Sequence, residues 1–216
     1  MNRRWLALAT LPLWTVGSTA LAASTTELGL HGQITPTACT PQLSSGGVID
    51  YGKISQQDLN FDKGTRLPVR TLVLTLGCTG PSRFALRMGD NRDGTATVNS
   101  EIYYGLGLDG SGNKVGLYSM TFDPTQTSAD AMNPVYGTES TTGGVAWRTA
   151  NRNRIDIGAK SYLGFTDQDG STAGPAAIQA LSSTVTVETV INAKQNLDLS
   201  HEVLLDGSAT LEVVYL

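Results

Sequence analysis

The sequence predicts an all-β fold, a β-sandwich, and two observations carry this prediction. Helical periodicity is nearly absent from the chain after its first 22 residues. The chain instead contains short runs rich in Val, Leu, Thr and Tyr, separated by Gly, Asp and Asn. Such runs form strands, and the separating residues are those that turns prefer. Many short strands with turns between them are typical of a sandwich.

Turn residues separate the expected strands. A Gly-Pro turn separates two strand candidates, and Phe84, Leu86 and Met88 of the second alternate on the side that faces inward. One short helix is expected over 174–181, and residues 123–144 are expected to form a long surface connection that extends towards 174. The strand candidates are residues 32–39, 67–78, 83–90, the hairpin 102–122 around the turn DGSGN, 183–191 and 208–216.

The first 22 residues have the layout of a secretory signal peptide. Arg3 and Arg4 precede an apolar run, and Ala20-Leu21-Ala22 supplies small residues for cleavage. The run is too short to span about 30 Å of hydrocarbon, so a membrane anchor is not expected. Cleavage after Ala22 would leave 13 basic and 19 acidic residues, a net charge of −6. This acidic balance argues against nucleic acid as a partner.

Cys39 and Cys78 are the two cysteines of the chain. In an exported protein an even pair is typical of a disulfide. Closing a loop of about 40 residues would stabilise the fold by about 4 kcal/mol in the chain-entropy model. A redox or metal pair is the alternative, but the close C-x-x-C spacing is missing.

Motifs that would carry chemistry each have a simpler explanation. The GLGLDG stretch (105–110) matches a dinucleotide fingerprint but runs into a turn, so it predicts a hairpin and no cofactor. DNRDG (90–94) and DQDG (167–170) resemble parts of calcium loops without completing one. His31 and His201 lie in polar or terminal stretches, where solvated histidines are expected, and no nucleophile elbow occurs. The sequence therefore predicts neither an enzyme nor a metal site.

The alternating strands at the two ends of the expected mature chain raise the main question. Residues 27–34 place Leu28, Leu30, Gly32 and Ile34 on one face. The last residues alternate too, with Ala209, Leu211, Val213 and Tyr215 on one side. The first strand either pairs with the last inside one sandwich or leaves its domain to complete another copy's edge.

Several spacings together resemble the pilin subunits of the chaperone–usher pathway of Gram-negative bacteria, most of all the beta-type fimbrial subunits. Such pilins begin with a short alternating extension and reach a cysteine seven residues after a Gly, as Gly32 and Cys39 do here. The second cysteine follows some forty residues later at the end of a strand, where Cys78 stands. Pilins of this family end with a penultimate tyrosine, which is Tyr215 here.

The resemblance implies an immunoglobulin-like sandwich that lacks its last strand. Residues 1–22 would be the signal peptide, 23–34 a donor-strand extension and 35–216 the sandwich domain, with a long loop region around 123–174. A periplasmic chaperone would first fill the groove, and an outer-membrane usher would exchange it for the next subunit's extension, building a fimbrium on the cell surface. The implied donor face is Leu28, Leu30, Gly32 and Ile34, and the implied groove and chaperone-binding residues are Leu211, Val213, Tyr215 and Leu216.

Two other functions stay open at this point. A minor or tip-proximal subunit could recognise a host glycan through residues 123–174, and glycan binding would distinguish it. A self-contained secreted β-sandwich, such as a hydrolase or lectin, would be a stable monomer without any partner strand. The fimbrial hypothesis predicts the opposite, namely a subunit that needs a strand from a neighbour or a chaperone to be stable.

Overall fold

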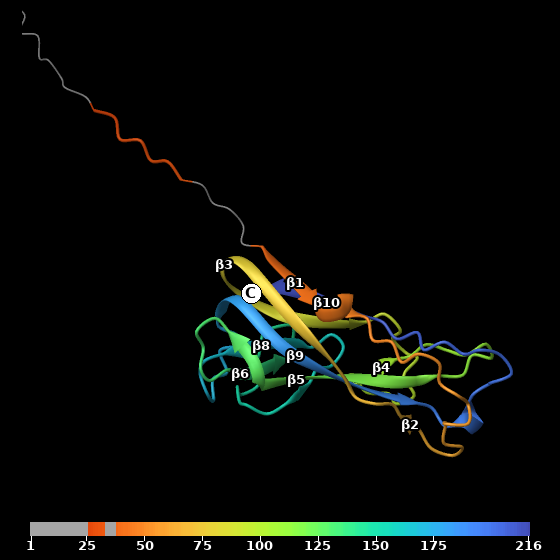
Figure 1. Ribbon diagram of the computed structural model, residues 1–216. Coiled ribbons are helices and arrows are strands. Elements are labelled where there is room, and N and C mark those ends of the chain that lie inside the picture. Colours follow the sequence, from red (N-terminus) through yellow and green to blue (C-terminus); the bar gives the residue numbers. More distant parts are fainter. Residues whose placement is uncertain (1–25, 33–37) are drawn as a thin grey trace, which may run out of the picture. The chain divides into compact units, whose positions relative to one another are not determined.

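The computed structural model describes residues 26–32 and 38–216. These belong to two separate units, the first ending at Thr35 and the second beginning at Pro36. The second unit is built from antiparallel strands, and its described residues contain no α-helix (Figure 1). The expectation of an all-β fold is therefore confirmed. Across residues 26–32 and 38–216, no helix has the length and apolar character needed to cross a bilayer.

Strands and two short 3₁₀ turns alternate along the second unit. In chain order they are β1 (Cys39–Leu43), η1 (Ser44–Gly47), β2 (Thr65–Arg66), β3 (Arg70–Asp90), β4 (Tyr104–Gly105), β5 (Gly116–Ala129), β6 (Tyr136–Ser140), β7 (Ile155–Asp156), β8 (Tyr162–Thr166), β9 (Ala177–Ile191), η2 (Lys194–Asn196) and β10 (Ala209–Tyr215).

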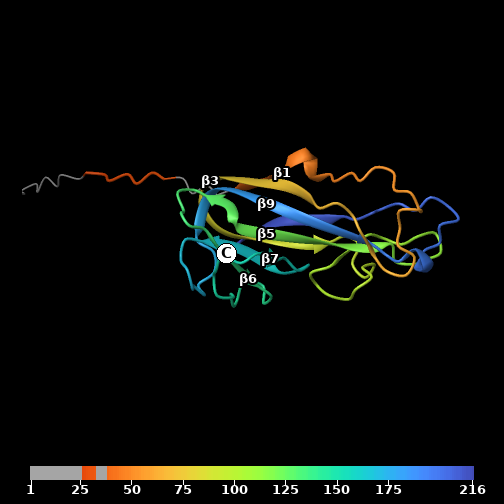
Figure 2. The ribbon, with the colours of Figure 1, turned by 60° about the horizontal axis from the view of Figure 1, so that its bottom comes forward.

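The long strands β3 and β9 form the centre of the sheet and curl together. They pair antiparallel from Arg70 opposite Val187 to Arg83 opposite Ala177, with a shift of register between Gly77 and Ser82. β5 pairs with the other edge of β9, while the second half of β3 pairs with β8, which in turn pairs with β6. Figure 2 shows β9 between β3 and β5. One antiparallel sheet thus bends round to cover a shared interior.

The alternation of buried and exposed side chains explains both the strands and the core. In the first half of β3 the even-numbered Leu72, Leu74 and Leu76 are buried, while Thr71, Val73 and Thr75 between them are exposed. After the bend, Phe84, Leu86 and Met88 are buried in the same cluster, as the sequence predicted. β9 adds the buried row Leu181, Val185 and Val187. Because both halves of β3 face one cluster, the curl is what closes the core.

Polar groups inside the domain are satisfied locally. The Tyr104 hydroxyl donates to the Ile157 carbonyl at 3.0 Å, and the Tyr104 and Tyr118 rings stack with centroids 5.2 Å apart. Burial of both phenols raises their pKa well above the usual value. The 102–122 hairpin is formed as expected, with Leu108 bridged to Lys114 across the turn.

Two expectations, a turn at Gly80-Pro81 and a helix over 174–181, were wrong. The Gly80-Pro81 segment does not separate two strands, because β3 continues through it as a bulge. Residues 174–181 are no helix, since β9 begins at Ala177. The spacing of three between the buried Ile178 and Leu181 comes from the same bulge, and it imitates a helical period.

Residues 123–174 are likewise not one long loop. β5 runs on to Ala129, and β6, β7 and β8 all lie within the region. The pattern is hidden because buried positions are occupied by small or polar residues. Thr138, Ser140 and Thr166 are nearly fully buried, and the Thr138 hydroxyl donates to the Arg148 carbonyl. A scheme that expects apolar residues inside misses strands of this kind.

Candidate functional site

Among the described residues, the edge of β10 that faces away from β3 has no partner strand. β10 pairs with β3 from Ala209 opposite Asp90 to Tyr215 opposite Phe84. The flanking bonds, from Asn91 N–H to the Ser208 carbonyl and from Leu216 N–H to the Arg83 carbonyl, are both 3.0 Å long. Even-numbered residues therefore bond to β3 in this ladder.

The odd-numbered residues consequently direct their backbone groups away from β3. These are Ala209, Leu211, Val213 and Tyr215, each with one N–H and one carbonyl. Among residues 26–32 and 38–216, no strand other than β3 pairs with β10. A seven-residue edge with a donor and an acceptor at every second position is thus available to another strand.

The side chains of the same residues are only half covered. Leu211 and Val213 pack against the core cluster but remain partly exposed, and Tyr215 is 50% exposed. Leu74 and Leu86, in equivalent core-facing positions on β3, are fully buried. The core therefore lacks a full cover along β10. Of the groove residues expected from the sequence, Leu211 lines the groove described below, and Val213 and Tyr215 lie on the same face of β10. Leu216, next to them, is 47% exposed.

β1 forms the opposite wall. It pairs with the first half of β3, from Cys39 opposite Cys78 to Leu43 opposite Leu74. The Cys39–Cys78 disulfide is present as predicted and joins the end of β1 to β3. The Cys39 N–H donates to the Tyr215 hydroxyl at 2.7 Å, so β1 and β10 approach each other at this end. Cys39 and Tyr215 thereby link the two walls.

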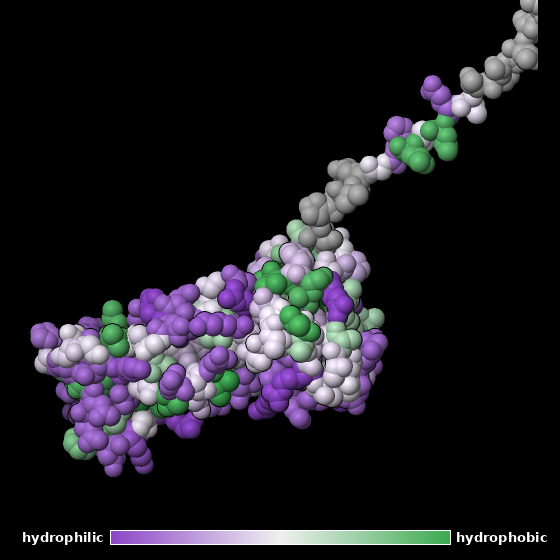
Figure 3. Space-filling model, turned by 180° about the vertical axis from the view of Figure 1, so that it is seen from behind, coloured by the Kyte–Doolittle hydropathy of each residue, from purple (hydrophilic) through white to green (hydrophobic). Residues whose placement is uncertain are grey.

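An apolar groove of about 460 Å³ lies between these walls. Leu43 and Pro41 line it from β1, Leu211 lines it from β10, and Leu74 of β3 lies at its base. Figure 3 shows apolar side chains gathered on this face of the domain. The groove has the composition expected of a surface that buries alternate apolar side chains of an added strand.

A second hollow of about 530 Å³ lies between the segments that follow β1 and precede β10, residues 49–59 and 197–205. Hydrogen bonds fix the second of these segments at both ends. The Asp198 N–H donates to the Asp109 carboxylate at 2.7 Å. At the other end, Arg92 donates to both carboxylate oxygens of Asp206, each at 2.8 Å.

These ties make the segment before β10 sensitive to acid. The Ser111 hydroxyl, with Ser200, lowers the pKa of Asp198 to about 2, and the hydrogen bond from Arg92 lowers the pKa of Asp206. A carboxylate whose pKa is lower in the folded state stabilises the fold above its unfolded pKa of about 3.9, and this stabilisation is lost as the pH falls through the folded value.

We therefore expect residues 198–206 to loosen as the pH falls from about 4 to about 2, before the β3–β9 sheet opens. Amide hydrogen exchange, corrected for the intrinsic effect of pH, measures this. The double variant Asp198→Asn/Asp206→Asn should exchange quickly at these amides even at pH 7. Equal protection of the segment at pH 2 and pH 7 in the natural chain would contradict the expectation.

The predicted donor residues are described in part. Residues 26–32 have no regular secondary structure, and Leu28 and Leu30 are 86% and 89% exposed. Gly32 is exposed as well. Ile34 and residues 1–22, where a signal peptide is expected, lie outside the described residues. Two large apolar side chains thus stand free in water at alternate positions.

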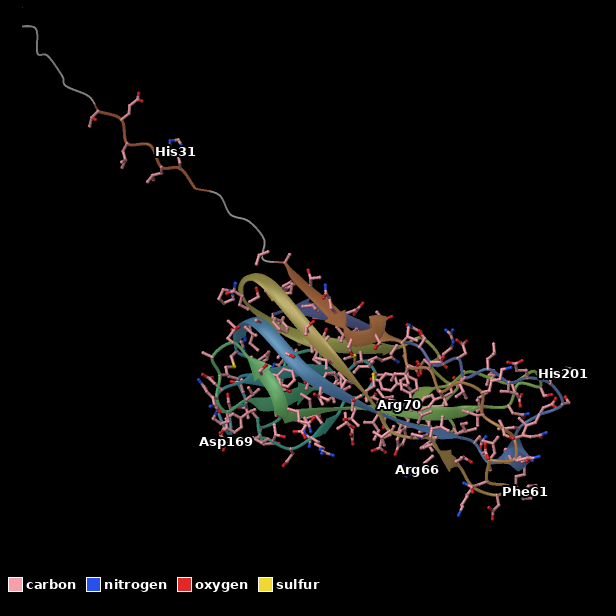
Figure 4. The ribbon with its side chains drawn as sticks, viewed as in Figure 1. His31, Phe61, Arg66, Arg70, Asp169 and His201 are labelled. Carbon is pink, nitrogen blue, oxygen red and sulfur yellow. A yellow bond between two sulfur atoms is a disulfide. The ribbon has the colours of Figure 1, made fainter. Side chains whose placement is uncertain are left out.

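The other motifs have structural roles. Gly105 lies in β4, and the Val115 N–H donates to the Gly107 carbonyl across the hairpin, so GLGLDG belongs to a hairpin arm and its turn. The Asp90 carboxylate accepts the backbone N–H groups of Arg92 and Gly105. His31 and His201 are exposed, and His201 and Asp169 lie at opposite ends of the domain (Figure 4). Within residues 26–32 and 38–216, no group of three or more His, Cys, Asp or Glu side chains is placed to hold a metal ion.

Sequence reasoning did not find the β1 wall. Pro41, Leu43 and Leu74 line the groove, and the Cys39–Tyr215 hydrogen bond joins residues 176 positions apart. One signal was available, because a proline two residues after Cys39 indicates an edge strand.

Comparison with known proteins finds distant relatives. Residues 28–109 match a family described as "Protein of unknown function (DUF1120)". The chain is 25% identical over 241 residues to Protein GltF of Escherichia coli (strain K12), covering 96% of this chain and 95% of that protein. It is 22% identical over 225 residues to the Uncharacterized protein YhcF of the same organism, covering 91% and 93%. No solved structure matches. These names state no activity and no fimbrial role.

Proposed function

We propose that this protein is a structural subunit of a surface fimbria, assembled by strand donation between neighbouring copies. One observation carries the proposal: within the part of the chain that the structure describes, one edge of β10 has no partner strand, and the apolar row on β10 is only partly covered. An edge of this kind is a template for pairing with another chain. Its natural occupant is an extended segment with alternate apolar side chains.

Residues 26–34 of another copy fit that description. Leu28 and Leu30 alternate with Gly29 and His31, and both leucines are exposed. Burying each of them would contribute roughly 1.5–3 kcal/mol. Each ladder hydrogen bond to β10 would add roughly 0.5–1.5 kcal/mol. Together these terms would drive the association of two subunits against the entropy that association costs.

The finer fold and the route of assembly belong to the same proposal. The curled sheet would be an immunoglobulin-like sandwich without its last strand, as the resemblance to pilins implies. A periplasmic chaperone would occupy the groove first, and an outer-membrane usher would exchange it for the next subunit's extension. The disulfide agrees with an oxidising compartment such as the periplasm. No cofactor and no catalytic group is needed for this activity.

Glycan recognition by residues 123–174 has no specific observation in its favour. The hypothesis of a glycan-binding site required a long exposed loop, whereas β6 and β8 of this region are largely buried in the fold. We therefore keep assembly as the single proposed function.

Deleting residues 23–33 from the mature chain tests the proposal. We expect the truncated protein to stop polymerising in size-exclusion chromatography and electron microscopy. It should still bind a synthetic peptide of residues 25–35 added in solution. Continued polymerisation of the truncated chain would refute the proposal.

Point variants provide a matched control for the deletion. Leu30→Asp places a charge on the apolar face of the extension and should block polymerisation, because a carboxylate buried without a partner is costly. His31→Asp changes the neighbouring residue on the opposite face and should polymerise normally. A full chain that stays monomeric at every concentration would indicate that its own extension seals the groove, and it would also refute the proposal.

A further inference from the structure

The two walls of the groove differ in the backbone groups that they offer. In β1, the bond from Thr79 N–H to the Ala38 carbonyl, at 3.0 Å, sets which residues face β3. The antiparallel register then directs the N–H and carbonyl groups of Cys39, Pro41 and Leu43 away from β3, into the groove.

Of these three positions, one keeps an available donor. The Cys39 N–H is already bonded to the Tyr215 hydroxyl at 2.7 Å. Proline has no N–H, so Pro41 offers a carbonyl alone. Leu43 retains its N–H but ends the strand, because Ser45, Gly46 and Gly47 follow with φ of 55°, 61° and 77°. β1 can therefore not supply the regular alternation of donors and acceptors that a ladder needs.

β10 offers the complete set. All four odd-numbered residues from Ala209 to Tyr215 have an N–H on the open edge, and the strand contains no proline. Prolines on edge strands are a known means of preventing further pairing. The proline of this groove thus stands on one wall, and a full complement of amides stands on the other.

We propose that the groove has a single hydrogen-bonding wall: an added strand forms its backbone ladder with β10 and contacts β1 through side chains. The occupant is the 26–34 segment of a second copy, so the inference rests on the proposed function. Leu43, Pro41 and Leu211 would enclose its apolar side chains. This arrangement leaves β1 paired with β3 alone while partners on β10 are exchanged.

The first test is amide hydrogen exchange by NMR on the full mature chain with Leu30→Asp, which cannot donate its own extension. The probe is a synthetic peptide of residues 25–35. Peptide binding should slow exchange at least about tenfold at Leu211 and Val213 and leave Leu43 within about threefold. Equal protection of Leu43 and Val213 would overturn the inference.

The second test restores the missing donor. Pro41→Val in the same Leu30→Asp chain keeps an apolar side chain on the groove and adds an N–H on the open edge of β1. One additional hydrogen bond should tighten peptide binding by about 2- to 10-fold. Thr40→Val is the matched control, since the backbone groups of Thr40 are directed to β3 and its side chain is exposed, and it should leave the affinity unchanged. Unchanged or weaker binding by Pro41→Val would count against the single-wall arrangement.

The outcomes separate this inference from the proposed function. A peptide that fails to bind the Leu30→Asp chain would refute strand donation itself, and the inference with it. A peptide that binds but protects both walls equally would leave strand donation standing and refute the inference alone.

Discussion

Replacing Val213 by Asp is expected to abolish subunit polymerisation and to weaken binding of the 25–35 peptide at least about a hundredfold. Val213 lies in the middle of β10, faces the core and remains partly exposed in the free domain. A carboxylate at this partly exposed position would keep contact with water while the edge of β10 is unpaired. An added strand would remove that water without supplying a positive partner, which costs several kcal/mol.

Val73→Asp is the matched control for this variant. Val73 is 43% exposed on the opposite face of β3, away from the groove. The same change of side chain there should leave polymerisation and peptide affinity within about threefold of the natural chain. Circular dichroism separates loss of binding from loss of fold. If Val213→Asp unfolds the domain, the milder Val213→Thr should stay folded and bind several-fold more weakly. Full polymerisation of folded Val213→Asp or Val213→Thr would contradict the prediction.

Removing the disulfide should have the largest effect on stability. Cys39 and Cys78 close a loop with a sequence separation of 39 residues. In the chain-entropy model, the double variant Cys39→Ala/Cys78→Ala should lose about 4 kcal/mol of unfolding free energy. Denaturant titration of the natural and variant chains measures the difference.

The same variant should also damage the groove. β1 is five residues long and, among the described residues, pairs with β3 alone, so the disulfide is its strongest attachment to β3. Without it we expect the amides of β1 that face β3 to exchange much faster while those of β9 remain protected. A reducing agent should reproduce both effects in the natural chain and change nothing in the variant. Equal stability of the oxidised and variant chains would contradict this expectation.

Strands with one buried face could be predicted from the sequence. Strong alternation of apolar and polar residues predicted β10 and both halves of β3, and the buried Phe84, Leu86 and Met88 lie where they were expected. These predictions hold because a strand with one buried face must alternate, whatever its neighbours are. The disulfide between the two cysteines was predicted equally well, from the expected export of the chain and the even number of cysteines.

The failures share a different cause. The bulge between Gly77 and Ser82 changed the spacing of buried residues in β9 and gave Ile178 and Leu181 a helical appearance. In β6, buried Thr138 and Ser140 hid the alternation because their hydroxyls are satisfied inside the fold. In β8 the last four residues are all buried, so buried and exposed side chains do not alternate there. Both effects depend on neighbouring strands, which a local pattern cannot include.

The sequence alone determined that this chain forms strands, that it is cross-linked once, and that alternating apolar faces stand near both of its ends. These properties reside in runs of a few residues. Only the tertiary structure decided that β10 has one partner strand among residues 26–32 and 38–216, and that a groove separates it from β1. Whether an edge is open depends on register and on curl between residues as distant as Cys39 and Tyr215, since a strand's own residues specify its faces and not its neighbours.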